Sequence, residues 1–204
     1  MKITSLEIIK VPPSWVWLRI HTDTEHVGLG EPYLENHAAT VIAEVKRLEP
    51  FLIGKDPTQV EKLWKAMYES GNGYLGGPVK MSAISGVDMA LWDLAGKAAG
   101  VPIYQMLGGK FHDRIKMYRA AGGDLPWTIE PGDPYRPGNP PQSDIEDDTP
   151  EAFRECARVL TQEWGFKTLK VHISPGDGLE VTSEVNLFAE KFAAAREGAG
   201  PDIP

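Results

Sequence analysis

Two basic side chains stand two positions apart in the stretch GFKTLKVHIS, residues 165–174, where Lys170 and His172 alternate with apolar residues. Side chains two positions apart lie on the same face of a β-strand. The stretch therefore predicts a strand that places an amine and an imidazole side by side, opposite an apolar face. We take Lys170 and His172 as the candidate functional pair; the alternative is that both face solvent at the end of a strand.

Other motifs that could carry chemistry are weak in this sequence. The glycines of GNGYLGGPV, residues 71–79, lack the spacing of a P-loop or a dinucleotide fingerprint, so a mobile loop over an active site is the better interpretation. Asp88 and Asp93 are five positions apart on a predicted helix and do not share a face. No Cys/His cluster indicates zinc. From these residues we expect no metal site in the chain.

The composition indicates an ordinary globular protein. The chain has 204 residues, of which 42% are hydrophobic and 25% charged, and its net charge is -8. The acidic balance argues against nucleic acid or an anionic membrane as the main partner. Cys156 is the only cysteine, which excludes an internal disulfide and fits a reducing compartment. With no apolar run of membrane-spanning length, we expect a cytoplasmic protein.

The first half of the chain predicts an antiparallel meander followed by helices. Three stretches read as strands, residues 2–11, 15–21 and 27–31. Helices are expected over 38–48 and over 80–99, where Gly100 provides a C-cap. Between them, another helix is expected after the N-cap Asp56, with Pro57 at its first position. Apolar side chains recur at helical spacing in each of them.

The pattern changes near Phe111. Strands are expected over 115–121 and 166–173, and helices from the Thr149-Pro150 cap to Trp164 and over 183–197. The polar, proline-rich segment 125–149 is too long for an ordinary connection and is not regular structure. The order strand, helix, strand, helix predicts the start of a parallel α/β array.

Several motifs together resemble one protein family. They are VPPSWVWLRIHTD, GLGEP, FLIGKDPTQVEKLWKAMY and, most specifically, GGPVKMSAISGVDMALWDLAGKAAGVPIYQMLGGK at residues 76–110. The chain resembles the mandelate racemase and muconate lactonizing enzyme family of the enolase superfamily, and most of all its galactonate dehydratase-type acid-sugar dehydratases. The resemblance implies an α+β capping domain (three-stranded antiparallel meander plus helices) over residues 1–112. Residues 113–204 are then the first two β-α units of a truncated TIM-type barrel.

The resemblance also implies roles for individual residues. Lys170 and His172 match the positions where the racemases carry a lysine-x-lysine pair, one member of which removes a proton next to a carboxylate. Function in such barrels gathers at the C-terminal ends of strands, where both residues would lie. The loops of the cap then supply the candidate substrate-binding residues Trp15, Glu35, His37 and Tyr74.

The resemblance further implies a longer enzyme. The family's metal ligands are acidic residues on the third, fourth and fifth barrel strands, and the sequence ends at Pro204, where the third strand is expected. We therefore expect Mg²⁺ in the full-length family enzyme, no cofactor bound by this chain, and no activity from the 204 residues alone. The full-length parent is expected to be a homo-oligomeric carbon-oxygen lyase (hydro-lyase) acting on a small acid sugar.

Two alternatives remain open from the sequence. The pair Lys170 and His172 departs from lysine-x-lysine, and a racemase or cycloisomerase of the same superfamily would share the features above. A non-catalytic capping or interaction module is the alternative from another functional class. Such a module should not display the open edges of parallel strands, which invite aggregation or pairing.

Overall fold

The computed structural model describes residues 1–11, 15–71, 73, 76–121, 149–171 and 182–203. The chain divides into two compact parts, an N-terminal unit, Met1–Phe111, and a C-terminal unit, His112–Pro204. No helix in the described part of the chain has both the length and the apolar composition that crossing a bilayer requires.

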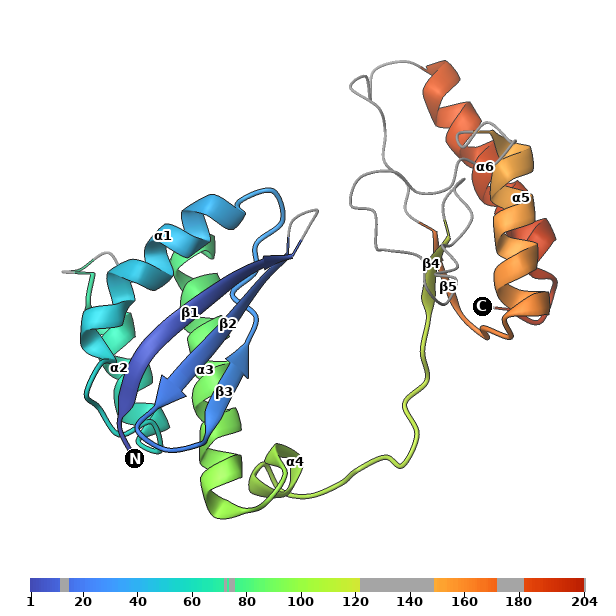
Figure 1. The fold of residues 1–204 in the computed structure, drawn as a ribbon. Coiled ribbons are helices and arrows are strands. Elements are labelled where there is room, and N and C mark those ends of the chain that lie inside the picture. Colours follow the sequence, from blue (N-terminus) through green and yellow to red (C-terminus); the bar gives the residue numbers. More distant parts are fainter. Residues whose placement is uncertain (12–14, 72, 74–75, 122–148, 172–181, 204) are drawn as a thin grey trace, which may run out of the picture. The chain divides into compact units, whose positions relative to one another are not determined.

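The N-terminal unit begins with the antiparallel sheet that the sequence predicts (Figure 1). Its strands are β1 (Ile3–Val11), β2 (Trp15–Thr22) and β3 (Val27–Gly30), joined in the order β1-β2-β3. The alternation of apolar residues predicted for β2 is confirmed, because the side chains on one face of the strand are buried and those on the other face are mostly exposed. The buried side chains are Val16, Leu18 and Ile20.

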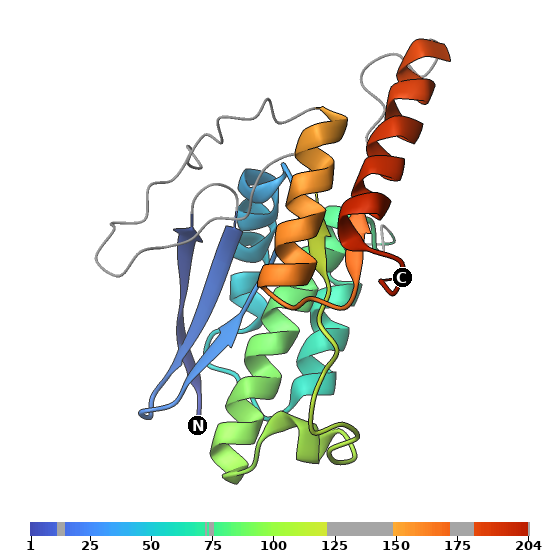
Figure 2. The same ribbon diagram turned by 90° about the vertical axis from the view of Figure 1, so that its right-hand side faces the viewer.

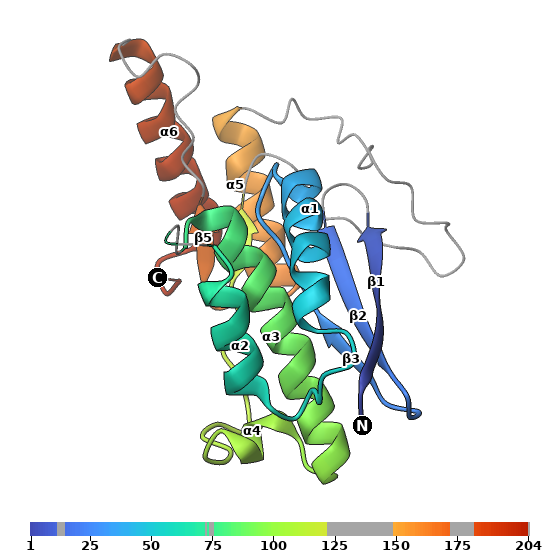
Figure 3. The same ribbon diagram turned by 90° about the vertical axis from the view of Figure 1, so that its left-hand side faces the viewer.

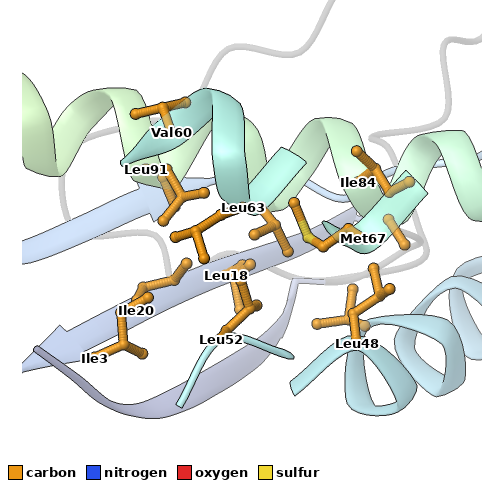
Figure 4. Close-up of a cluster of buried hydrophobic side chains, with 14 of the residues drawn as sticks. Ile3, Leu18, Ile20, Leu48, Leu52, Val60, Leu63, Met67, Ile84 and Leu91 are labelled. Atoms are coloured by element: carbon orange, nitrogen blue, oxygen red, sulfur yellow. The ribbon is translucent and has the colours of Figure 1, made fainter. Parts of the chain in front are cut away.

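Three helices cover the buried face of this sheet (Figure 3). They are α1 (Ala38–Leu48), α2 (Val60–Glu69) and α3 (Pro78–Ala99), and the short α4 (Ile103–Met106) follows. The interior is one continuous cluster of aliphatic side chains drawn from the sheet and all three helices (Figure 4). The predicted apolar stripe of α1 is confirmed, since its four members are all buried: Val41, Ile42, Val45 and Leu48.

Two sequence predictions for these helices need correction. Asp56 does not cap α2, which begins at Val60; its carboxylate instead accepts hydrogen bonds from the backbone N–H and the hydroxyl of Thr58. This local turn competes with the helix for the Asp56 side chain. The helical spacing of the apolar residues over 80–99 places Ala98 on the apolar face of that helix, but Ala98 is exposed. Gly100 ends α3 in the left-handed conformation, with φ 67°, as predicted.

The C-terminal unit contains two parallel strands and two helices that lie side by side (Figure 2). The elements are β4 (Arg119–Ala121), α5 (Pro150–Arg158) with a π-helical turn (Val159–Glu163), β5 (Leu169–Val171) and α6 (Thr182–Ala199). The Thr149 hydroxyl accepts a hydrogen bond from the Ala152 N–H, so the predicted cap is confirmed. The prediction of a strand from Ile115 was wrong: the exposed residues before Arg119 have no strand partner in the described structure.

Candidate functional site

Three segments gather at one end of the N-terminal unit. The register pairs Leu18 of β2 with Gly30 of β3, so the loop after Gly30 runs toward the end of the sheet where Trp15 begins β2. Gly28 lies against Ala90 and Gly30 against Gly86, and α3 therefore begins at this same end. Trp15, the loop 31–37 and the start of α3 thus share one end of the unit.

Glycines fix how closely β3 lies on α3. A Cβ atom at Gly30 would lie 1.9 Å from the carbonyl oxygen of Gly86, and one at Gly28 would lie 2.2 Å from that of Ala90. A Cβ atom at Gly86 would in turn lie 2.3 Å from the backbone nitrogen of Pro32. Only a hydrogen fits at these three positions. The strand and the first residues of the following loop therefore rest directly on the helix backbone.

An ion pair on α3 adds a polar tie to β3. The Asp93 carboxylate accepts hydrogen bonds from the Leu29 N–H at 2.9 Å and from Lys97 Nζ at 2.7 Å. Lys97 Nζ also donates to the carbonyl oxygen of Val27 at 2.6 Å. These two backbone groups lie on the outer edge of β3, which has no further strand beside it in the described sheet. The pair therefore satisfies an edge that would otherwise be open.

Glu35 and His37 lie on the loop between β3 and α1. Pro32 is buried, the His37 N–H donates to the Leu34 carbonyl at 3.0 Å, and Asn36 adopts a positive φ of 60°. The His37 carbonyl then accepts from the Val41 N–H and starts α1. The side chains of Glu35 and His37 are both exposed at the end of a loop whose backbone is held by local hydrogen bonds.

A hollow lies where α1, the end of α2 and the start of α3 meet. It has a volume of about 520 Å³ and includes Arg47, Ser70 and Lys80 among its lining residues. Arg47 is held by the Glu44 carboxylate and by the Ser70 hydroxyl, while the buried Lys80 ammonium donates to the Tyr68 carbonyl at 2.7 Å. These cations stabilise the ends of helices. Tyr74, the candidate on the adjoining glycine loop, lies outside the described residues.

The candidate catalytic lysine belongs to the C-terminal unit. Lys170 is the middle residue of β5, pairs in register with Ala120 of β4, and has an exposed side chain between half-buried Leu169 and Val171. The predicted alternation of the strand is therefore seen at these three positions. His172 lies outside the described residues, so its place on the same face as Lys170 stays a prediction.

Charged side chains occupy the sheet face that points away from the helices. Glu7 of β1 lies 2.8 Å from the Nε2 atom of His21 and 3.7 Å from the guanidinium of Arg19, both on β2. The hydrogen bond with His21 is the main influence that lowers the pKa of Glu7 below its ordinary value, and the charge of Arg19 acts in the same direction. Trp15, on the same face, is 50% exposed.

The described residues do not fit a Mg²⁺ site. Mg²⁺ requires several oxygen ligands in near-octahedral geometry. Among the residues that the structure describes, no three His, Cys, Asp or Glu side chains converge on one point. Asp93 is committed to Leu29 and Lys97, and burial raises the pKa of Asp88, with the charge of Glu61 adding to this effect.

The sequence interpretation missed the tie between Asp93 and Lys97. It tested Asp93 only as a metal ligand together with Asp88. The signal was present in the i,i+4 spacing of an acid and a base on one helix, which favours an ion pair. The hydrogen bond from the Leu29 N–H to Asp93 joins residues 64 positions apart. The spacing of residues along one helix does not predict such a contact.

The N-terminal unit is similar to a known domain family, and the chain is similar to proteins of the enolase superfamily. Residues 10–108 match the family described as mandelate racemase / muconate lactonizing enzyme, N-terminal domain. The chain is 54% identical over 132 residues to a D-galactonate dehydratase from Verminephrobacter eiseniae (strain EF01-2), a match that covers 65% of this chain and 34% of that protein.

Two solved structures are similar in fold. A member of the enolase superfamily from Salmonella Typhimurium is 32% identical with a TM-score of 0.78, covering 99% of this chain and 53% of that one. An enolase from Pantoea ananatis, with D-gluconate and Mg bound, is 30% identical with a TM-score of 0.64, covering 84% of this chain and 36% of that one. The chain therefore spans about a third of the length of the dehydratase and about half of the Salmonella structure.

Proposed function

Residues 10–108 are the N-terminal domain of the mandelate racemase / muconate lactonizing enzyme family, and from this premise we propose that the chain is the N-terminal portion of an acid-sugar dehydratase. The similarity to D-galactonate dehydratase is the reason for proposing a dehydration reaction. The N-terminal unit is then the cap that closes over a sugar acid. The C-terminal unit corresponds to the first two β-α units of a barrel, which its parallel strands β4 and β5 support.

The cap residues bind the substrate in this proposal. Trp15 offers an exposed indole for the carbon face of a sugar, and the carboxylate of Glu35 accepts hydrogen bonds from its hydroxyl groups. His37 and Tyr74 complete the set of polar contacts. The close contact of β3 with α3 keeps the loop of Glu35 in one conformation, which reduces the entropy lost when the substrate binds.

Lys170 and His172 act on the carbon next to the substrate carboxylate. One of them removes the proton from this carbon, and the electron pair of the C–H bond forms a carbon–carbon double bond. The C–O bond to the neighbouring hydroxyl breaks, and this hydroxyl takes the proton back from the same residue and leaves as water. A racemase of the same family would use the same first step but return the proton to the carbon. The Mg²⁺ expected for the full-length family enzyme has no ligand set in the described residues.

The 204-residue chain alone gives the first test. We expect neither specific Mg²⁺ binding nor dehydration of galactonate, because the described residues offer no converging oxygen ligands. Isothermal titration with Mg²⁺ and an assay for the 2-keto acid product measure both. Stoichiometric micromolar binding, or turnover above background, would contradict this expectation.

A chimera tests the proposed role of the cap. Residues 1–111 of this chain replace the aligned part of the D-galactonate dehydratase from Verminephrobacter eiseniae. We expect turnover of D-galactonate, a raised KM in the chimera with Glu35→Gln or Trp15→Ala, and no change with the control Glu31→Gln, an exposed carboxylate at the start of the same loop. A folded chimera without turnover would show that this cap does not serve a galactonate dehydratase.

A longer chimera with residues 1–204 tests Lys170. The substitution Lys170→Ala should lower kcat by about 10²-fold or more with little change in KM, since a proton-transferring group acts mainly in the transition state. Lys167→Ala is the matched control, an exposed lysine three positions earlier. Retention of full turnover by Lys170→Ala would show that the lysine is only a charge on the strand.

A further inference from the structure

A groove on the N-terminal unit lies between β3, α3 and the short α4. Its volume is about 490 Å³, and its lining comes from β3, α3 and the segment 103–107. Most of this lining is apolar: Leu29, Met89, Trp92, Ile103 and Leu107. Two carboxylates complete it, Asp88 and Asp93.

The apolar lining is exposed to an unusual degree. Leu29 is 52% exposed, Met89 47% and Leu107 67%. Single exposed apolar residues are ordinary on protein surfaces, but several around one groove mark a surface that binds another molecule. The apolar part alone does not say which molecule.

The two carboxylates of the groove differ in what they contact. Asp93 is neutralised by Lys97 and also accepts the Leu29 N–H. Asp88 has neither a hydrogen bond nor an ion pair to any residue that the structure describes. Burial and the nearby charge of Glu61 both raise the pKa of Asp88, so the surroundings disfavour its negative charge. The groove thus holds one carboxylate without a compensating cation among the described residues.

We propose that this groove docks a segment of another protein that presents an arginine or lysine between apolar side chains. The apolar flanks of such a segment would cover Leu29, Met89 and Leu107. Its cation would pair with Asp88, whereas an entirely apolar partner would bury this carboxylate without a compensating charge, which is unfavourable. A guanidinium fits best, because it can make two parallel hydrogen bonds to one carboxylate.

A metal ion is a poor occupant of the same place. Asp93 already serves Leu29 and Lys97, which leaves Asp88 as the single available carboxylate of the lining. One carboxylate among apolar side chains does not replace the hydration shell of a divalent cation. The proposed docking does not depend on the dehydratase activity and can fail or succeed separately from it.

Titration with a pair of peptides tests the docking site. The probe is acetyl-Ala-Leu-Arg-Leu-Ala-amide, and its counterpart carries citrulline, a neutral isostere, in place of arginine. Nuclear magnetic resonance of the Met89 methyl group and the Trp92 indole in the full 204-residue chain reports occupancy of the groove. We expect saturable shifts with the arginine peptide and about five- to tenfold weaker binding of the citrulline peptide, the range of a partly exposed charge pair.

The substitution Asp88→Asn should remove the preference for arginine, while Glu69→Gln, an exposed carboxylate on α2, should leave it intact. Equal binding of both peptides to the unsubstituted chain, or shifts elsewhere without shifts at Met89 and Trp92, would overturn the proposal. Sedimentation equilibrium measures whether the chain associates with itself. Self-association that Asp88→Asn abolishes would also overturn it, because a second copy of the chain would then fill the groove.

Discussion

The two units support their sheets in different ways. In the N-terminal unit, three strands rest on α1, α2 and α3 through one continuous buried cluster. In the C-terminal unit, the three-residue strands β4 and β5 meet α5 and α6 through two small clusters, which share the half-buried Leu169 and Val171. The first unit therefore derives its stability from its own interior. The described part of the second has much less apolar contact per strand.

A core truncation in each unit tests this difference and should give the largest effects. Leu91 and Leu160 are both fully buried leucines, one in each unit. Leu91→Ala should cost about 3–5 kcal/mol, because the dense surroundings cannot collapse into the cavity, and Leu160→Ala about 2–3 kcal/mol. Urea unfolding followed by hydrogen exchange of segments separates the two transitions. Equal costs would show that the two cores are equally well packed.

The contact between β3 and α3 gives the next effect. An alanine in place of a helical glycine ordinarily stabilises a helix by about 0.5–1 kcal/mol. Gly86→Ala should do the opposite and cost about 1–3 kcal/mol, since the new methyl group meets the backbone of Pro32. Ser85→Ala, an exposed neighbour on the same helix, is the control. A stabilised Gly86→Ala would mean that β3 can move away from the helix freely.

Removal of the polar tie should have a smaller effect. Asp93→Ala leaves the Leu29 N–H and the Lys97 ammonium to water, which should cost about 1 kcal/mol of unfolding free energy in the N-terminal unit. The Leu29 amide should also exchange faster. The control is Glu69→Ala, which breaks the i,i+4 pair with Lys65 on α2; that pair is exposed and worth about 0.3–0.5 kcal/mol. Unchanged exchange at Leu29 in Asp93→Ala would refute the tie.

The sequence predicted the N-terminal unit better than the described part of the C-terminal unit, for physical reasons. Alternation in β2 and the stripe of α1 are strong because one face of each is fully buried. Strand length in the C-terminal unit was overestimated, since Ile115 and Met117 have apolar side chains but are exposed. Apolar alternation reports what a residue could bury, and a strand forms only where a partner strand supplies hydrogen bonds.

The candidate site was predicted only in part. Spacing placed Lys170 on a strand with apolar neighbours on the other face, and the register of the sheet brings Trp15 and the loop of Glu35 to one end of the N-terminal unit. The roles of these residues in binding and catalysis stay predictions. The glycine contacts that fix the loop could not be read from the sequence, because they join residues more than fifty positions apart.

The smallest expected effect concerns Asp88, whose negative charge destabilises the folded N-terminal unit. The pKa of Asp88 is raised in the folded chain, so the folded state binds more protons than the unfolded state between the ordinary value of 3.8 and the raised value. Stability must therefore fall as the pH rises through this window, and the penalty is fully present at neutral pH. Asp88→Asn removes the charge and should stabilise the N-terminal unit at pH 7. The gain should stay below about 1 kcal/mol, because water screens a partly exposed carboxylate.

Asp56 provides a control of opposite sign. Hydrogen bonds from the Thr58 backbone and hydroxyl lower the pKa of Asp56, so its contribution is present above the ordinary value and is lost as the pH falls. Asp56→Asn should therefore destabilise the unit at pH 7, and the difference should shrink in acid. For Asp88→Asn, the gain should also vanish below the window, where both variants carry a neutral group. A destabilised Asp88→Asn at pH 7 would show that the carboxylate already has a cation within the chain, and the groove would then have no unmet charge to offer a partner.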